Sequence, residues 1–281
     1  MDASGYPPAM KSLSVGWVLY RRDILTALRT PTLYVILAFI CLLLAFFLRN
    51  FFITISVLSV VVSQDPAALP FFLSVSALSL YLAVASSISI CFERERRTLE
   101  VLFYGPVTAP IRIVSLFLRD LSLFVLGLAV VLLHLWIVSL GSNLPVGPHS
   151  LRSAARATLL VWPMIDFSLL ISALVRHTRT AIVIVGGAFV LLAGLQAGYI
   201  VMSGLPAENL SLFMIYIRHA LDLVLSIVQW LSPFAYIARI SEGAAGGPEL
   251  GAGWYLALAG GYGAGLLALA AWVLAKRDKQ A

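Results

Sequence analysis

The charged residues of the chain gather most densely at 92–102. Six charges fall in the eight positions from Glu93 to Glu100, and apolar runs lie on both sides, at 69–91 and 113–140. A charged residue at the centre of a membrane-spanning helix costs about 3 kcal/mol, so burying all six would cost on the order of 18 kcal/mol. The stretch is therefore expected to lie in water between two membrane spans.

The spacing within this stretch predicts a short amphipathic helix. Glu93 and Arg97 carry opposite charges four residues apart, as do Arg96 and Glu100, and such pairs support a helix. An apolar side can form opposite the charges. Its members would be Phe92, Leu99, Leu102 and Phe103. A helix of this kind between two spans is expected to be a docking surface for a soluble partner.

Motifs for enzymatic chemistry are absent from the sequence. It holds no GxxxxGK[ST] motif to hold ATP phosphates, no HExxH and no GxSxG. The four histidines, His134, His149, His177 and His219, fall on separate segments. We therefore expect no enzymatic activity, metal site or cofactor on this chain.

Asp166 is an ionisable residue near the middle of the apolar run 154–175, three residues after Pro163. Such a residue inside a span is by default a functional hypothesis. Its partner could be Arg119 or His134, whereas a structural ion pair or a protonated, hydrogen-bonded side chain would be equally compatible. Arg119 could instead pair with its neighbour Asp120.

A row of small polar residues follows one side of the apolar run 69–91. Ser76, Ser79, Ala83 and Ser86 share this side at helical spacing. These serines, together with Asp166, could line a translocation path. Serines in membrane helices also bond to backbone carbonyls or pack between helices, so both interpretations stay open.

The composition identifies the elements that must position these residues. Hydrophobic residues make up 61% of the 281, and the mean hydropathy is +0.98. Apolar runs of about 20 residues can cross a bilayer. Six such runs occur, at 31–48, 69–91, 113–140, 154–175, 181–203 and 251–275. The sequence thus predicts an all-α polytopic membrane protein with six transmembrane helices, in one membrane domain at 14–281.

The distribution of Lys and Arg predicts the orientation in the membrane. With six spans both termini share a side, and that side would hold most of the 19 Lys and Arg. The other side would hold Arg49, Arg152, Arg156, Arg218 and Arg239. Because cytoplasmic loops carry the excess of positive charge, both termini are expected in the cytoplasm. The net charge of +6 is explained in this way without a nucleic-acid partner.

Three segments outside the spans carry further predictions. Residues 1–13 are expected to be a disordered tail, and 14–30 an interfacial helix capped by Ser14, with Trp17 and Tyr20 towards the lipid. A plain extension of the first span is the alternative. Two apolar pieces, 51–62 and 210–236, are too short or too interrupted to span comfortably. The second is expected to be an external re-entrant or amphipathic element before the last span.

The charged stretch resembles the signature of ABC-2 type permeases, the membrane subunits of one class of ABC exporters. Residues 95–108 read ERRTLEVLFYGPVT, similar to the family pattern E-x-x-[GT]-T-L-E-x-L-x-x-x-P-[VL]-[ST]. A glycine is common in the family where this chain has Arg97. A second match is Leu231-Ser232-Pro233-Phe234, followed by Gly243. With the spans and the expected outer elements, the resemblance covers nearly the whole chain.

The resemblance implies a permease in a bacterial inner or plasma membrane, driven by a separate ATPase chain that binds ATP and Mg. Two permeases, identical or homologous, would assemble with two ATPases. The helix between spans two and three would be a coupling helix that inserts into the ATPase. Its coupling residues would be Glu93, Arg94, Arg96, Arg97, Thr98, Leu99, Glu100, Leu102 and Phe103.

Three other functions compete with this interpretation. A proton-coupled secondary transporter using Asp166 would predict matching broken helices in two repeat halves. Pro163 interrupts the fourth run, but the first offers only Pro31 at its edge. A membrane-embedded enzyme would need a cluster of catalytic groups that the sequence lacks. A scaffold subunit without transport activity remains open.

Overall fold

The computed structural model describes residues 8–58, 68–104, 107–142, 148–204, 212–231 and 252–278. Within these ranges the chain is almost entirely helical and contains no strand. The helices are α1 (Pro8–Arg29), α2 (Pro31–Leu58), α3 (Ala68–Glu95), α4 (Thr98–Phe103), α5 (Ala109–Ser142), α6 (Pro148–Leu174), α7 (Thr178–Gly204), α8 (Leu212–Leu231) and α10 (Ala252–Asp278). The prediction of an all-α chain is confirmed for this part of the protein.

Four helices are long and apolar enough to cross a membrane. The segments are Pro31–Asn50 in α2, Leu73–Glu95 in α3, Ala109–Gly141 in α5 and Ala257–Arg277 in α10. They indicate a multi-pass membrane protein. The other two predicted spans correspond to α6 and α7, whose apolar stretches among the described residues, Val161–Leu174 and Thr178–Leu192, are shorter.

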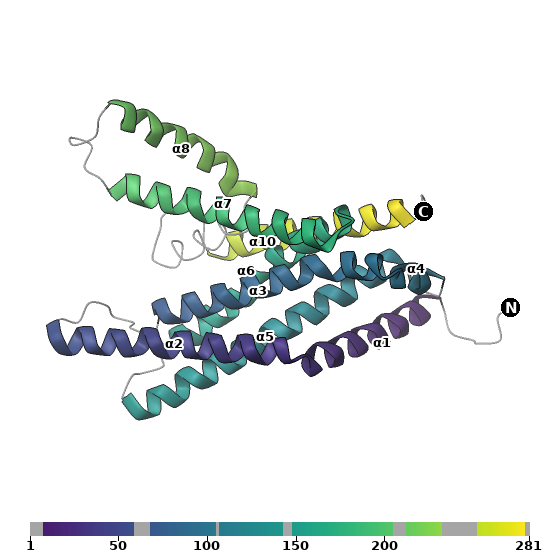
Figure 1. Ribbon diagram of the computed structural model, residues 1–281, viewed down its shortest axis with the longest axis horizontal. Coiled ribbons are helices and arrows are strands. Elements are labelled where there is room, and N and C mark those ends of the chain that lie inside the picture. Colours follow the sequence, from purple (N-terminus) through teal and green to yellow (C-terminus); the bar gives the residue numbers. More distant parts are fainter. Residues whose placement is uncertain are drawn as a thin grey trace.

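The long helices lie side by side and meet at one end, at the right of Figure 1. There α1 begins, α3 leads into α4, α5 begins, α6 leads into α7, and α10 ends (Figure 1). We call this the charged end, because residues 92–100 lie there. Helix α8 turns back along α7 and packs on it at the opposite end (Figure 1).

The first helix differs from its prediction. It begins at Pro8, so 8–13 are helical and Ser14 lies inside the helix instead of capping it. Proline suits the first position of a helix, since its missing N–H would be unsatisfied there anyway. Residues 1–7 of the predicted tail lie outside the described part of the chain.

Helix α1 packs lengthwise on the first half of α5. The Tyr20 hydroxyl lies 2.9 Å from that of Ser122, and Leu19 is buried. Trp17, expected on the same side as Tyr20, is 64% exposed. The side facing α5 buries Leu19 and Asp23, and the orientation of Trp17 towards lipid stays a prediction.

The two external pieces also differ in extent from their predictions. Residues 51–58 continue α2 without a break, since neither glycine nor proline interrupts the helix after Asn50. Residues 212–231 form the single helix α8, on which Arg218 is half-buried and His219 and Asp222 are exposed. Residues 59–62 and 232–236 lie outside the described part, as do Ser232, Pro233, Phe234 and Gly243 of the second family match.

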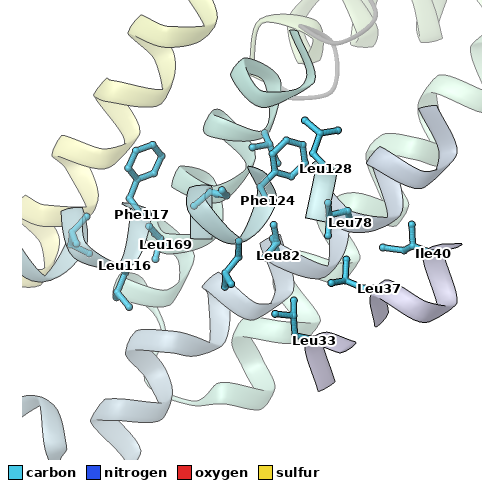
Figure 2. Packing of buried hydrophobic residues seen from close by; sticks show 14 of the residues in the cluster. Leu33, Leu37, Ile40, Leu78, Leu82, Leu116, Phe117, Phe124, Leu128 and Leu169 are labelled. Carbon is cyan, nitrogen blue, oxygen red and sulfur yellow. The ribbon is translucent and has the colours of Figure 1, made fainter. Parts of the chain in front are cut away.

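The main core fills the space between α2, α3, α5 and α6 (Figure 2). Leu37 of α2, Leu78 and Leu82 of α3, and Phe124 of α5 meet there, all buried. Gly127 lets α5 approach closely, because a Cβ atom on it would lie 2.7 Å from a methyl of Leu78. Close-packed side chains leave no room for that atom without a shift.

We expect Gly127→Ala to lower the free energy of unfolding by about 1–3 kcal/mol, the usual cost of overpacking a core. The measurement is unfolding by denaturant in mixed micelles. Gly141→Ala, on the same helix with nothing within 4 Å of the added methyl, is the matched control. It should be neutral or stabilising by up to about 1 kcal/mol, since alanine favours helix. Equal effects of the two changes would contradict this packing.

Candidate functional site

The charged stretch forms a corner instead of one continuous helix. Helix α3 ends at Glu95, and Arg97 takes a left-handed backbone conformation with φ 57° and ψ 15° before α4 begins. The Arg97 N–H donates to the carbonyl of Arg94 at 3.0 Å, and the Thr98 hydroxyl to that of Glu93 at 3.1 Å. The predicted pair of Glu93 with Arg97 is wrong, because the helix breaks between them. We call residues 92–104 the α3–α4 corner.

Arg112, in the first turn of α5, is the central charge of this end. Its side chain is 1% exposed. The guanidinium donates to both carboxylate oxygens of Glu93 on α3 and to Asp23 on α1. Arg22 also donates to Asp23, at 3.0 Å. These four residues, the Arg112 cluster, join α1, α3 and α5 through charge-assisted hydrogen bonds, the strong kind.

A second ion pair lies further along α5. Arg119 donates to its neighbour Asp120 at 2.7 Å and to Ser89 at 2.8 Å. The other oxygen of Asp120 accepts a hydrogen bond of 2.6 Å from Ser86 of α3. The predicted self-pairing of Arg119 and Asp120 is therefore confirmed, and these bonds tie α5 to α3.

Arg94 caps the end of α6. Its guanidinium donates to the carbonyl of Val175 at 2.5 Å and to that of Ala173 at 3.4 Å. Arg277, near the end of α10, donates to the same Ala173 carbonyl at 3.1 Å. The last carbonyls of a helix lack partners within the helix and attract cations. Arg94 thus links the α3–α4 corner to α6.

Glu95 caps the start of α7. Its carboxylate accepts the backbone N–H of Thr178 at 2.8 Å and the Thr178 hydroxyl at 2.9 Å. An acidic group is favourable at a helix N-terminus. Three consecutive residues, Glu93, Arg94 and Glu95, therefore bind α5, α6 and α7 in turn.

The predicted apolar side of the corner is mostly covered by this chain. Leu99 is buried, and Phe103 packs against the main core. Leu102 is half-buried, so this chain itself covers much of that side. Val101 of α4 and Tyr104, the residue after α4, are exposed at 69% and 91%.

Glu95 is exposed but bound to α7, and the other exposed charges at the corner are Arg96, Arg97 and Glu100. The Arg96 guanidinium lies 4.0 Å from the centre of the Phe92 ring, a cation–π contact. In the part of the chain that the structure describes, none of the three has an ion pair, so the predicted pair of Arg96 with Glu100 does not form. These charges are available to a partner.

Two of the three serines of the predicted path make hydrogen bonds inside the helix bundle. Ser79 is buried and donates to the carbonyl of Val75 at 2.7 Å. Ser86 donates to the carbonyl of Leu82 at 2.8 Å as well as to Asp120. Ser76 is half-buried. These bonds fit the packing interpretation, and a polar path along this side stays a prediction.

Asp166 has neither of its proposed partners. It is fully buried in α6, and both carboxylate oxygens lack a hydrogen-bond partner. Arg119 is engaged with Asp120 and Ser89, and the buried Nε2 of His134 has no partner. Among the described residues, no group of three His, Cys, Asp or Glu could hold a metal ion.

Sequence reasoning missed Arg112 and Asp23 as parts of the site. Neither residue belongs to the charged stretch 92–102 or to a motif of the sequence. A signal was present, because Asp23 lies on the side of α1 that also carries Tyr20 and Ile24, where an acid needs a partner. Periodicity alone could not say which helix supplies it.

Comparison with known families and with curated proteins found no match for this chain. The resemblance at 95–108 therefore stands on those residues themselves.

We expect Arg112→Met to lower the free energy of unfolding by about 3–5 kcal/mol, because it removes the guanidinium shared by the buried Asp23 carboxylate and the partly buried Glu93 carboxylate. The double change Glu93→Gln with Arg112→Met should recover most of this loss. Thermal unfolding in detergent measures both. A single change that costs less than about 1 kcal/mol would show that the cluster does not hold the helices together.

We expect Arg97→Gly to raise the free energy of unfolding by about 1 kcal/mol, since a left-handed conformation costs an L side chain that much and costs glycine nothing. Arg96→Gly is the matched control, because Arg96 has no positive φ. The control should be destabilising or neutral in the same unfolding assay. A stabilising control, or a destabilising Arg97→Gly, would contradict the strained conformation.

Proposed function

We propose that this chain is the permease subunit of an ATP-driven exporter of the ABC-2 type, and that the α3–α4 corner docks a separate ATPase chain. The observation that carries the proposal is the division of charges at the corner. Glu93, Arg94 and Glu95 bind other helices of the chain, while Arg96, Arg97 and Glu100 face outward. Force applied to the outward face would reach α1, α5, α6 and α7.

The course of the long helices supports six membrane spans in this proposal. Successive long helices α2, α3, α5, α6, α7 and α10 run in alternating directions along the bundle (Figure 1). The helices α6 and α7 are each 27 residues long, about 40 Å at 1.5 Å per residue, against a hydrocarbon core of about 30 Å. Because α1 begins and α10 ends at the charged end, its basic residues would face the cytoplasm of a cell membrane.

The expected working cycle follows from these contacts. Two permeases and two ATPases assemble, and ATP and Mg bind on the ATPase chains. When the ATPase pair closes, it displaces α4, and the displacement moves the attached helices as rigid bodies. The substrate path would then open between the two permeases.

The test is co-expression of the tagged chain with each stand-alone ABC ATPase of the source organism, followed by co-purification and ATP hydrolysis in reconstituted membranes. One ATPase should co-purify. The double reversal Arg96→Glu with Glu100→Arg should weaken that complex at least about tenfold, or about 1.4 kcal/mol. Both residues are exposed and unpaired, so insertion and folding should not change.

The control is Arg49→Glu. Arg49 is an exposed arginine of α2 that does not belong to the charged end. It should leave co-purification and ATP hydrolysis unchanged. Full assembly and turnover of the double-reversed protein, at equal membrane insertion, would overturn the docking role of the corner. Failure of every ATPase to co-purify would overturn the proposed function itself.

A further inference from the structure

The side chain of Asp166 on α6 lies against Gly263 of α10. A Cβ atom on Gly263 would lie 3.0 Å from Oδ2 of Asp166 and 3.1 Å from Nε1 of Trp162. A side chain at Gly263 would therefore be tighter than an ordinary contact against both residues. Phe117 of α5 packs against Trp162 in a tilted arrangement, with ring centres 5.4 Å apart.

The carboxylate makes no hydrogen bond in the packed state. Neither oxygen of Asp166 has a partner, and a donor beside it, the indole N–H of Trp162, is left without a partner as well. The backbone of α10 cannot substitute, because a helix uses its N–H groups for its own carbonyls. A carboxylate that loses water without gaining donors is costly.

The site also lacks a cation. The charged groups on the helices packed against α6 are occupied or exposed elsewhere. They are Glu93, Arg94 and Glu95 of α3, Arg112, Arg119 and Asp120 of α5, Arg179 of α7, and Lys276 and Arg277 of α10. Among the described side chains, Tyr81 and Cys91 of α3, His134 of α5 and Tyr262 of α10 are the other titratable groups. Cys91 donates to the carbonyl of Ser172, and Tyr262 has an interaction of its own. Within the described residues, no charged side chain acts on Asp166.

Asp120 shows what an ionised carboxylate receives in the same bundle. It is as buried as Asp166, at 1% exposure, but has a guanidinium at 2.7 Å and a hydroxyl at 2.6 Å. Asp166 has nothing comparable. A bound proton would remove its charge and turn one oxygen into a donor.

We propose that Asp166 is a proton-binding site at the contact of α6 and α10, and that this contact loosens when the proton leaves for water. An ionised Asp166 must be hydrated, and water can reach it only if α10 moves away at Gly263. The proton would thereby control how tightly these two helices pack. This inference does not depend on the ATPase-driven function proposed above.

The direct test is infrared difference spectroscopy of the purified protein in detergent at about pH 6, a condition at which an ordinary Asp is ionised. We expect the C=O stretching band of a protonated carboxylic acid in the wild type, shifted in D2O and lost in Asp166→Asn. Asp120→Asn should keep the band. If Asp166→Asn cannot be purified, Asp166→Leu serves for the same comparison.

The second test is thermal unfolding from about pH 5 to about pH 8. A carboxyl that keeps its proton in the folded protein but releases it in the unfolded chain makes folding stability fall as pH rises. Asparagine mimics the protonated shape and cannot ionise. The Tm of the wild type should therefore fall relative to that of Asp166→Asn, by at least about 2 °C over this range.

A matched pair on α10 tests the link to helix packing. Gly263→Ala should push the helices apart, admit water and weaken the acid band, whereas Gly265→Ala, with nothing within 4 Å of its methyl, should leave it unchanged. Absence of the band in the wild type, together with parallel Tm curves for wild type and Asp166→Asn, would overturn the proton site. A band that Gly263→Ala leaves unchanged would overturn its coupling to the α6–α10 contact.

Discussion

A guanidinium can stay buried in an apolar bundle only where carboxylates meet it, and this constraint organises the charged end of the protein. Arg112 is the largest fully buried side chain of the described residues. Its partners come from α1 and α3, which are distant in sequence. Because an unpaired buried charge costs several kcal/mol, the end of α3, the start of α5 and the body of α1 are fixed relative to one another.

The Arg112 cluster holds the α3–α4 corner rigidly in place. Glu93 is held by Arg112, and the two following residues cap the neighbouring helices α6 and α7. The strained conformation of Arg97 then turns the chain so that α4 lies across the end of the bundle, with Leu99 inward and Tyr104 outward. A rigid corner transmits displacement, whereas a flexible loop would absorb it. This is the physical reason why a docking element placed here could move the helices.

Much of the fold follows from the sequence, because length and hydropathy decide which segments can cross a bilayer. The predicted spans at 31–48, 69–91 and 113–140 each lie inside one helix of the structure. The ends of helices are harder to predict. Residues 51–58 extend α2 because no residue there stops a helix, and α1 starts at Pro8 because proline is compatible with a first turn. Local sequence preferences allow a helix to begin or end at several residues, and tertiary packing decides which of them it uses.

The site could be located from the sequence but its pairing could not. Charge density placed it at residues 92–102, yet the four-apart rule assigned Glu93 to Arg97, a partner on the same helix. The structure assigns it to Arg112, because the helix breaks and a buried cation competes more strongly than an exposed one.

The same limit applies to Asp166. The sequence shows that it lies in an apolar run, but not that its carboxylate has no hydrogen-bond partner or counter-charge. A hydrophobic pattern says that a residue is buried, whereas the absence of a counter-charge is a property of the neighbouring helices. The two buried acids Asp120 and Asp166 therefore resemble each other in sequence and differ in chemistry, because only one of them has an arginine within reach.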